Sequence, residues 1–289
     1  MTTQIITYGI TLGCVYALVA LGLVLIYRAT EIVNFAQGEM MMMSAYMFFT
    51  LYSMEKGLFT AVIGSLLFAV MLGVVMNTII SRPLIGKPIF AQIMATIALS
   101  IVLRSLTGVI WTHEDFFMYS PPVSMKTMDV GFLQISPHQI AIVGVSIILV
   151  LLLYLFLNLT RFGTAIKATS ENPVAAQLMG IPIKRIYIAV WILSSLVSAV
   201  AGMLIIPQFG LQPMLGSRLL LMALPAAVLG GFGKLEGAIA GGLILGVLES
   251  LATVYLPTSI YDIFPWIILI LMLLIRPDGL FGTPVRKRV

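Results

Sequence analysis

The stretch IITYGITLGCVYALVALGLVLI, from Ile5 to Ile26, decides the fold class. It contains no charged residue and is longer than the roughly 20 apolar residues that an α-helix needs to cross the hydrocarbon core of a bilayer. No charged residue precedes Arg28, so the run lacks the basic segment of a cleavable leader. We expect it to remain as a membrane span.

Further apolar runs follow along the chain. Six are clear candidates for spans: Phe59–Ile80, Ile89–Trp111, Gln139–Leu159, Ile186–Ile206, Gly237–Tyr255 and Ile263–Ile275. Two shorter runs, Gly38–Ser53 and Leu219–Gly230, fall near or below the length limit. The sequence therefore predicts an all-α polytopic membrane protein with about nine crossing segments, two of them short or broken.

The composition agrees, with 60% hydrophobic and 9% charged residues, against about 25% charged residues in a soluble domain. Cys14 is the single cysteine, which excludes a disulfide scaffold and a multi-thiolate metal site. His113 and His138 have neither a cysteine nor a His-Glu-x-x-His motif beside them, so no metal site is expected. We attribute the net charge of +5 to basic residues in cytoplasmic loops rather than to nucleic-acid binding. No catalytic residues are predicted.

The basic residues orient the chain, because cytoplasmic loops hold the excess of Lys and Arg. With nine crossings and the N-terminus outside, Lys56, Arg104, Lys126 and Arg218 lie outside or near the outer face. The other 12 of the 16 basic residues then lie inside: Arg28, Arg82, Lys87, Arg161, Lys167, Lys184, Arg185, Lys234, Arg276, Arg286, Lys287 and Arg288. We expect an N-out, C-in topology with residues 1–289 forming one domain.

The two short runs hold comparable places, each after a long span. Paired short or Gly/Pro-interrupted helices are the best sequence indication of a transport site. The candidate pathway residues beside them are Asn34, Gln37, Glu39, Gly230, Gly231 and Gly233. Two alternatives remain: both runs are simply short spans in a thin bilayer, and Glu39 serves the positive N-terminus of the following helix.

Arg104 and Glu249 lie within apolar helices. A charge inside the membrane costs at least about 2.5–3.5 kcal/mol on insertion scales, so each is a functional candidate. Both join the candidate translocation pathway, where they would bind an amino-acid zwitterion. Alternatively they pair with each other, or each reaches the headgroups.

Other features have structural interpretations. The external loop Thr112–Pro137 is expected to form an irregular cap, because it holds Pro121, Pro122 and Pro137. Pairs of glycines four residues apart, such as Gly9 and Gly13, allow close helix contacts. Ordinary packing within the subunit is favoured over a dimer face.

The longest cytoplasmic loop reads RFGTAIKATSENPVAAQLMGIPIKR, residues Arg161–Arg185. Asn172 can cap a helix that begins at Pro173, Gly180 can end it, and Pro182 prevents its continuation. The predicted helix Pro173–Met179 presents Val174, Ala175, Leu178 and Met179 to the cytoplasm. It would dock into a partner's groove or rest on the membrane.

Four sequence blocks resemble the permease family of branched-chain amino acid ABC importers. One is the Arg161–Arg185 loop, with Arg161, Phe162, Gly163 and a later Gly180-Ile181. The others are Gly22-Leu-Val-Leu-Ile-Tyr27 with Asn34-Phe-Ala-Gln-Gly38, then Gly230-Gly-Phe-Gly233 with Gly237 and Gly241, and Arg276-Pro-Asp-Gly-Leu-Phe-Gly282. The resemblance covers essentially the whole chain and is to the family's shorter permease type.

The resemblance implies a permease subunit, in a bacterial inner membrane, of an ATP-driven importer working by alternating access. It implies a second permease subunit in a heterodimer, two cytoplasmic ATPases that hold ATP and magnesium, and a periplasmic binding protein. No GxxxxGK[ST] phosphate loop is present, so we expect no ATP bound by this chain. The residues assigned to coupling are Arg161, Gly163, Lys167, Glu171, Asn172, Pro173, Ala175, Ala176, Leu178, Met179, Gly180 and Ile181.

Three alternatives to that function stay open. Members of the same family are assigned to urea and short amides. An ion-coupled secondary transporter would use Glu249 as a proton carrier, and a passive channel-like subunit is a further rival.

Overall fold

The computed structural model describes residues 2–111, 116, 121–130, 133–261, 263–276 and 278–282. By its internal contacts the chain forms two compact units. Unit 1 comprises Met1–Val24, Pro121–Ser146 and Leu219–Val289, and unit 2 comprises Leu25–Ser120 and Ile147–Arg218. That the two units act as one permease domain stays a prediction.

The described residues are mainly helical. In chain order the helices are α1 (Thr2–Thr30), α2 (Gln37–Ser53), α3 (Leu58–Met76), the π-helical turn η1 (Asn77–Ser81), α4 (Arg82–Leu84), α5 (Ile89–Trp111), α6 (Pro137–Leu159), α7 (Arg161–Glu171), α8 (Pro173–Leu178), α9 (Ile183–Phe209), α10 (Leu215–Gly230), α11 (Leu235–Tyr255), α12 (Thr258–Tyr261) and α13 (Phe264–Ile275). Helices α1, α6 and α10 contribute residues to both units.

Six helical stretches of the described chain are long and apolar enough to cross a membrane: Gln4–Thr30, Leu58–Leu84, Ile89–Trp111, Pro137–Leu159, Ile183–Phe209 and Leu235–Tyr255. The polytopic membrane class is thereby confirmed. The count of nine and the orientation stay predictions. Helix α13, expected among the clear spans, has 12 residues and a length of about 18 Å, so it joins α2 and α10 as a short helix.

Unit 2 is organised around contacts among α2, α3 and α9. Small residues allow the backbones to approach: a Cβ on Gly73 of α3 would lie 2.9 Å from Ile192 Cα of α9, and one on Gly202 would lie 2.8 Å from Met41 O of α2. Ser195 of α9 donates a 2.7 Å hydrogen bond to Ala69 O, which ties α9 to α3. A buried hydroxyl therefore supports this packing without being left unsatisfied.

Unit 1 shows the same use of small residues between the first part of α1 and α11. A Cβ on Gly246 would lie 2.3 Å from Gly13 Cα, and one on Gly242 would lie 2.5 Å from Ala17 Cα. Ser250 closes the contact with a 2.7 Å hydrogen bond to Ile5 O. The four-residue glycine spacing thus serves packing within the subunit, as expected.

Part of the predicted irregular cap is a small antiparallel hairpin. Strands β1 (Met128–Val130) and β2 (Leu133–Ile135) pair Met128 with Ile135 and Val130 with Leu133. His113, near the start of this loop, lies outside the described residues.

Candidate functional site

Helix α7 is the first part of the segment that follows α6, and the sequence patterns did not predict it. The Thr160 side chain caps it by accepting a 3.0 Å hydrogen bond from Gly163 N. A Cβ on Gly163 would lie 2.5 Å from Leu157 Cα of α6, so only glycine lets α7 fold back this closely. Thr160, a polar capping residue, was the sequence feature that could have predicted α7. Hydropathy does not identify a helix of 11 residues with few apolar side chains.

Helix α8 follows and has the caps that the sequence predicts. Asn172 Oδ1 accepts a 3.0 Å hydrogen bond from Ala175 N. At the other end, Gly180 N donates to Gln177 O and Ile181 N donates to Ala176 O, both at 3.0 Å, which is a Schellman motif. Gly180 has φ +84°, a left-handed conformation that favours glycine. The helix ends at Leu178, one residue earlier than expected, with Met179 as its cap residue.

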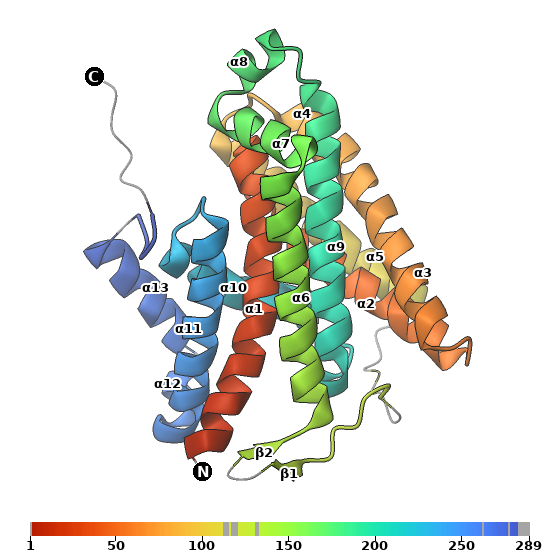
Figure 1. Cartoon of the computed structure of the whole chain (residues 1–289), viewed down its shortest axis with the longest axis vertical. Helices are drawn as coiled ribbons and strands as arrows, with labels where there is room; N and C mark the ends of the chain where they lie inside the picture. The colour runs from red at the N-terminus through yellow and green to blue at the C-terminus, as the bar shows by residue number, and fades with distance from the viewer. Residues whose placement is uncertain are drawn as a thin grey trace. The chain divides into compact units, whose positions relative to one another are not determined.

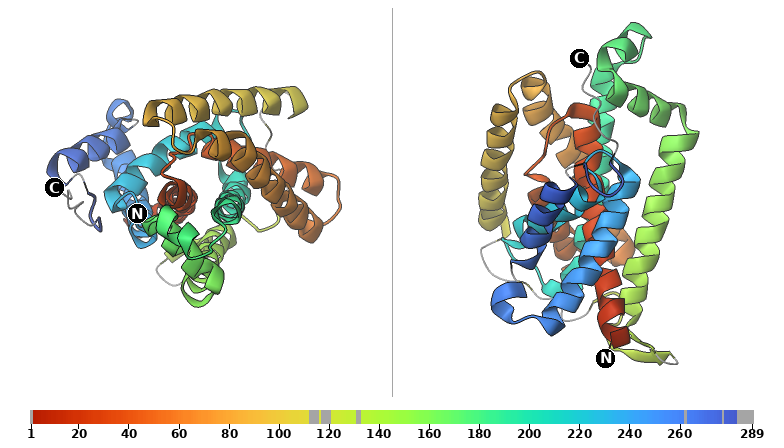
Figure 2. Two further views of the ribbon diagram at one scale, coloured as in Figure 1. Left: turned by 90° about the horizontal axis from the view of Figure 1, so that it is seen from above. Right: turned by 90° about the vertical axis from the view of Figure 1, so that its left-hand side faces the viewer.

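The two faces of α8 differ. Val174 is 68% exposed, and Leu178 and Met179 are each 84% exposed, whereas Ala176 is 4% exposed. Helices α7 and α8, drawn in green, lie at the end of α9 where that helix begins (Figures 1 and 2). The apolar face of α8 is exposed, whereas Ala176 packs inward, and the role of these residues in coupling stays a prediction.

The other residues assigned to coupling also fall into an exposed group and a buried group. Arg161 and Glu171 are exposed, whereas Gly163 is buried against α6. Lys167 Nζ donates a 2.5 Å hydrogen bond to Asn158 Oδ1, so it stabilises the turn between α6 and α7. The segment therefore consists of a structural part, α7, and a presented part, α8.

A charged cluster in unit 2 joins residues that the sequence singled out separately. Arg104 Nη2 of α5 lies 2.8 Å from Glu39 Oε1 of α2, and Arg104 Nε lies 3.2 Å from the same oxygen. Ser217, in the first turn of α10, hydrogen-bonds both side chains. The Glu39 side chain is 1% exposed and that of Arg104 is 29% exposed. Arg104 thus takes Glu39 as its carboxylate partner, rather than Glu249.

A second polar network surrounds the start of α2. Asn34 Nδ2 donates to Gln37 Oε1 at 3.1 Å, and Gln37 Nε2 donates to Ser194 Oγ of α9 at 2.8 Å. Ser198, one turn later, also accepts from Gln37. Sequence reasoning missed Ser194, Ser198 and Ser217. The serines spaced four apart in an apolar helix were a usable signal for the first two.

Glu249 lies in unit 1, in the second half of α11, and is 4% exposed. Its side chain hydrogen-bonds that of Tyr16 on α1. The carboxyl group is thus placed against a phenol within its own unit.

The glycines between α10 and α11 form a turn and a close contact. A Cβ on Gly230 would lie 1.8 Å from Gly237 O, and Gly231 and Gly233 have φ +109° and +140°. The segment after α13 docks on this turn, with Leu280 N donating to Leu229 O at 2.8 Å and Phe281 N donating to Gly230 O at 3.1 Å. The structure gives these glycines packing roles, and their lining of a pathway stays a prediction.

Comparison with known proteins identifies the family. Residues 5–273 match the family described as the permease component of the branched-chain amino acid transport system. The chain is 31% identical to the high-affinity branched-chain amino acid transport system permease protein LivH of Salmonella typhimurium, over 97% of this chain and 96% of that protein. It is 29% identical to BraD, the corresponding Pseudomonas aeruginosa permease protein, over 99% and 97%.

A probable LivH of Methanocaldococcus jannaschii is 32% identical, over 93% of this chain and 89% of that protein. Among solved structures, PsaBC from Streptococcus pneumoniae in complex with Fab has a TM-score of 0.51 at 16% identity, covering 94% of this chain and 91% of that chain. That likeness shows the fold alone. On the family match and the full-length relatives, the chain belongs to the family of permease components of branched-chain amino acid transport systems.

Proposed function

We propose that this chain is the membrane-spanning subunit of an ATP-driven importer of branched-chain amino acids, and that α8 receives the energy from a separate ATPase. The observation that carries the proposal is the exposed apolar face of α8 (Val174, Leu178, Met179), held by caps at both ends. The substrate class rests on the names of the full-length relatives.

The face of α8 suits insertion into a protein groove. Fully burying a side chain such as Val, Leu or Met contributes about 1.5–3 kcal/mol, and three neighbours on one short helix act as anchors in helix-in-groove binding. A groove on each of two ATPases would take one α8 from each of two permease subunits. The second permease, the ATPases with their ATP and magnesium, the periplasmic binding protein and a bacterial inner-membrane location are all part of this proposal.

Movement of α8 would reach the membrane helices through α7. Helix α7 contacts both α8 and α9, and Gly163 holds it against the end of α6. The Thr160 cap and this backbone contact fix α7 against the end of α6. We therefore expect a displacement of α8 to move α6 and α9 with it. Alternating access then follows when ATP binding favours one position of α8.

The Glu39–Arg104–Ser217 cluster is our candidate for a gate on the pathway. It links α2, α5 and the first turn of α10. A partly exposed guanidinium can leave a buried carboxylate only if another polar group replaces it. A substrate carrying both an ammonium and a carboxylate group offers both replacements. The network of Asn34 and Gln37 with Ser194 would hold the start of α2 in place beside it.

Val174→Asp tests the coupling role. Val174 lies in the first turn of α8, where a carboxylate is favoured by the helix dipole, so the helix itself should remain folded. Burying the new charge in an apolar groove should reduce ATPase co-purification and ATP-driven leucine uptake at least tenfold. The matched control is Thr164→Asp, which places the same charge on the exposed side of α7 and should preserve both.

The same assay separates the alternatives. Uptake that persists in Val174→Asp without ATPase, but stops when the ion gradient is collapsed, would replace the proposal with a secondary transporter. Uptake without any energy source would indicate a channel. Competition by urea or acetamide but not by leucine would reassign the substrate.

A further inference from the structure

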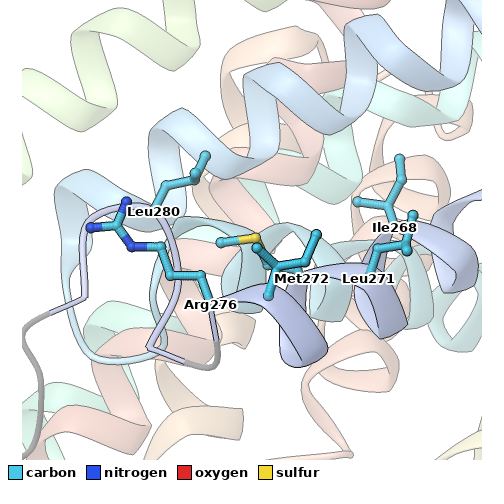
Figure 3. Close-up of a pocket in the computed structure, with 6 residues that line it drawn as sticks. Ile268, Leu271, Met272, Arg276 and Leu280 are labelled. Carbon is cyan, nitrogen blue, oxygen red and sulfur yellow. The ribbon is translucent and has the colours of Figure 1, made fainter.

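An open apolar groove runs along α13 in unit 1 (Figure 3). It has a volume of about 400 Å³ and is lined by Ile268, Leu271, Met272, Ile275, Arg276 and Leu280. The first four lie at positions i, i+3, i+4 and i+7 of the helix, and so share one face. The groove is thus a continuous stripe of side chains rather than a gap between unrelated segments.

The turn after α13 fixes one end of the groove. Gly279 N donates to Arg276 O at 2.9 Å, and Leu280 N donates to Leu229 O of α10 at 2.8 Å. Gly279 has φ +82°, which reverses the chain so that Leu280 stands beside Arg276 (Figure 3). From Ile268 to Arg276 the helix rises about 12 Å, so the groove has an apolar body and a cationic end.

We propose that this groove binds an anionic phospholipid of the surrounding bilayer, with an acyl chain along Ile268–Ile275 and the phosphate at Arg276. Arg276 directly follows the last residue of an apolar helix, which is the level at which headgroups meet a membrane protein. Guanidinium groups bind phosphate in bidentate geometry, and basic residues at the membrane edge select anionic headgroups.

The surroundings favour a lipid over a protein as the occupant. Leu271 is 50% exposed and Ile275 is 79% exposed, and the single charge lies at the end of the stripe rather than within it. Asp278 is also exposed in the following turn, but it does not line the groove. An amphiphile with one negative group at the end of an apolar chain matches this pattern of charge and apolar surface.

The test measures binding of dioleoyl phosphatidylglycerol and dioleoyl phosphatidylcholine to the full chain, purified with its co-purifying subunits, by native mass spectrometry. Arg276→Gln should weaken phosphatidylglycerol binding about fivefold, the effect of one basic residue at the membrane surface, and should leave phosphatidylcholine binding unchanged. The matched control Arg82→Gln removes a charge at the exposed start of α4, which does not line the groove, and should leave the binding of both lipids unchanged. Met272→Trp fills the groove and should weaken both.

Four results would overturn the proposal. Equal losses of phosphatidylglycerol in Arg276→Gln and Arg82→Gln would show a general effect of surface charge. Equal binding of the two lipids by the unmodified chain would remove the headgroup selectivity. Efficient cross-linking of Met272→Cys to a second protein chain in membranes would assign the groove to a protein contact. A loss of thermal stability without a change in lipid preference would reduce Arg276 to a cap at the negative end of α13.

Discussion

Glu39 and Glu249 are both acidic side chains buried in apolar helices, with exposed fractions of 0% and 4%, but their surroundings differ. Glu39 in unit 2 has a cationic partner from α5 and a hydroxyl from α10. Glu249 in unit 1 has a phenol from α1. The comparison teaches that an ionisable residue in a membrane helix can be accommodated by an ion pair or by a hydrogen bond to an uncharged side chain. The two solutions predict different mutational costs.

Arg104→Leu should have the largest effect. It leaves the fully buried Glu39 carboxylate without its counter-ion, which typically costs about 3–5 kcal/mol. Glu39→Gln should cost less, about 1.5–3 kcal/mol, because the Arg104 side chain is 29% exposed and can reach a polar environment. The free energy of unfolding in mild detergent measures both.

The combined variant Glu39→Leu with Arg104→Leu sharpens this result. Removing both charges should restore much of the stability lost in Arg104→Leu, since replacing both members of a buried pair is often nearly neutral. Additive losses in the double variant would mean that the two residues do not form a coupled pair in the membrane.

Tyr16→Phe should have an intermediate effect. It removes the hydroxyl that bonds Glu249 and keeps the ring, so we expect a loss of about 1–3 kcal/mol from leaving a buried polar group unsatisfied. Tyr154→Phe on α6 is the control, because Tyr154 is 53% exposed and should change stability by less than about 0.5 kcal/mol. Equal losses in the two variants would place Glu249 and Tyr16 outside hydrogen-bond reach.

Ser217→Ala should have the smallest effect, about 0.5–1.5 kcal/mol, since Glu39 and Arg104 keep their direct contact. Ser53→Ala serves as its control, because that hydroxyl is exposed and bonds only the backbone of its own helix. If Ser217→Ala destabilises the protein as much as Arg104→Leu, the hydroxyl contributes as much as the ion pair to holding α2, α5 and α10 together.

How much of these regions the sequence predicted depends on how far apart along the chain the interacting residues lie. Runs of apolar residues located the long spans and the short helix α2, because hydropathy is a property of consecutive residues. The caps of α8 were predicted because Asn172, Pro173 and Gly180 act on their own neighbours.

Long-range contacts were not predictable in the same way. Glu39 and Arg104 were each noted as charges in apolar surroundings, but 65 positions separate them, and nothing local says which partner each will take. The contact of Gly163 with α6 is local in sequence, but it was missed because it depends on how sharply the chain folds back between the two helices. A Cβ added to Gly163 would lie 2.5 Å from Leu157 Cα.

The capped ends of α8 have a consequence for how a complex would assemble. A free peptide of six residues is too short to stay helical in water, but here Asn172 at one end and Gly180 with Ile181 at the other fix the backbone. The helix is therefore preorganised, and association need not order the segment at the moment of contact. Assembly with a partner should then be limited by diffusion and orientation, with no folding step in between.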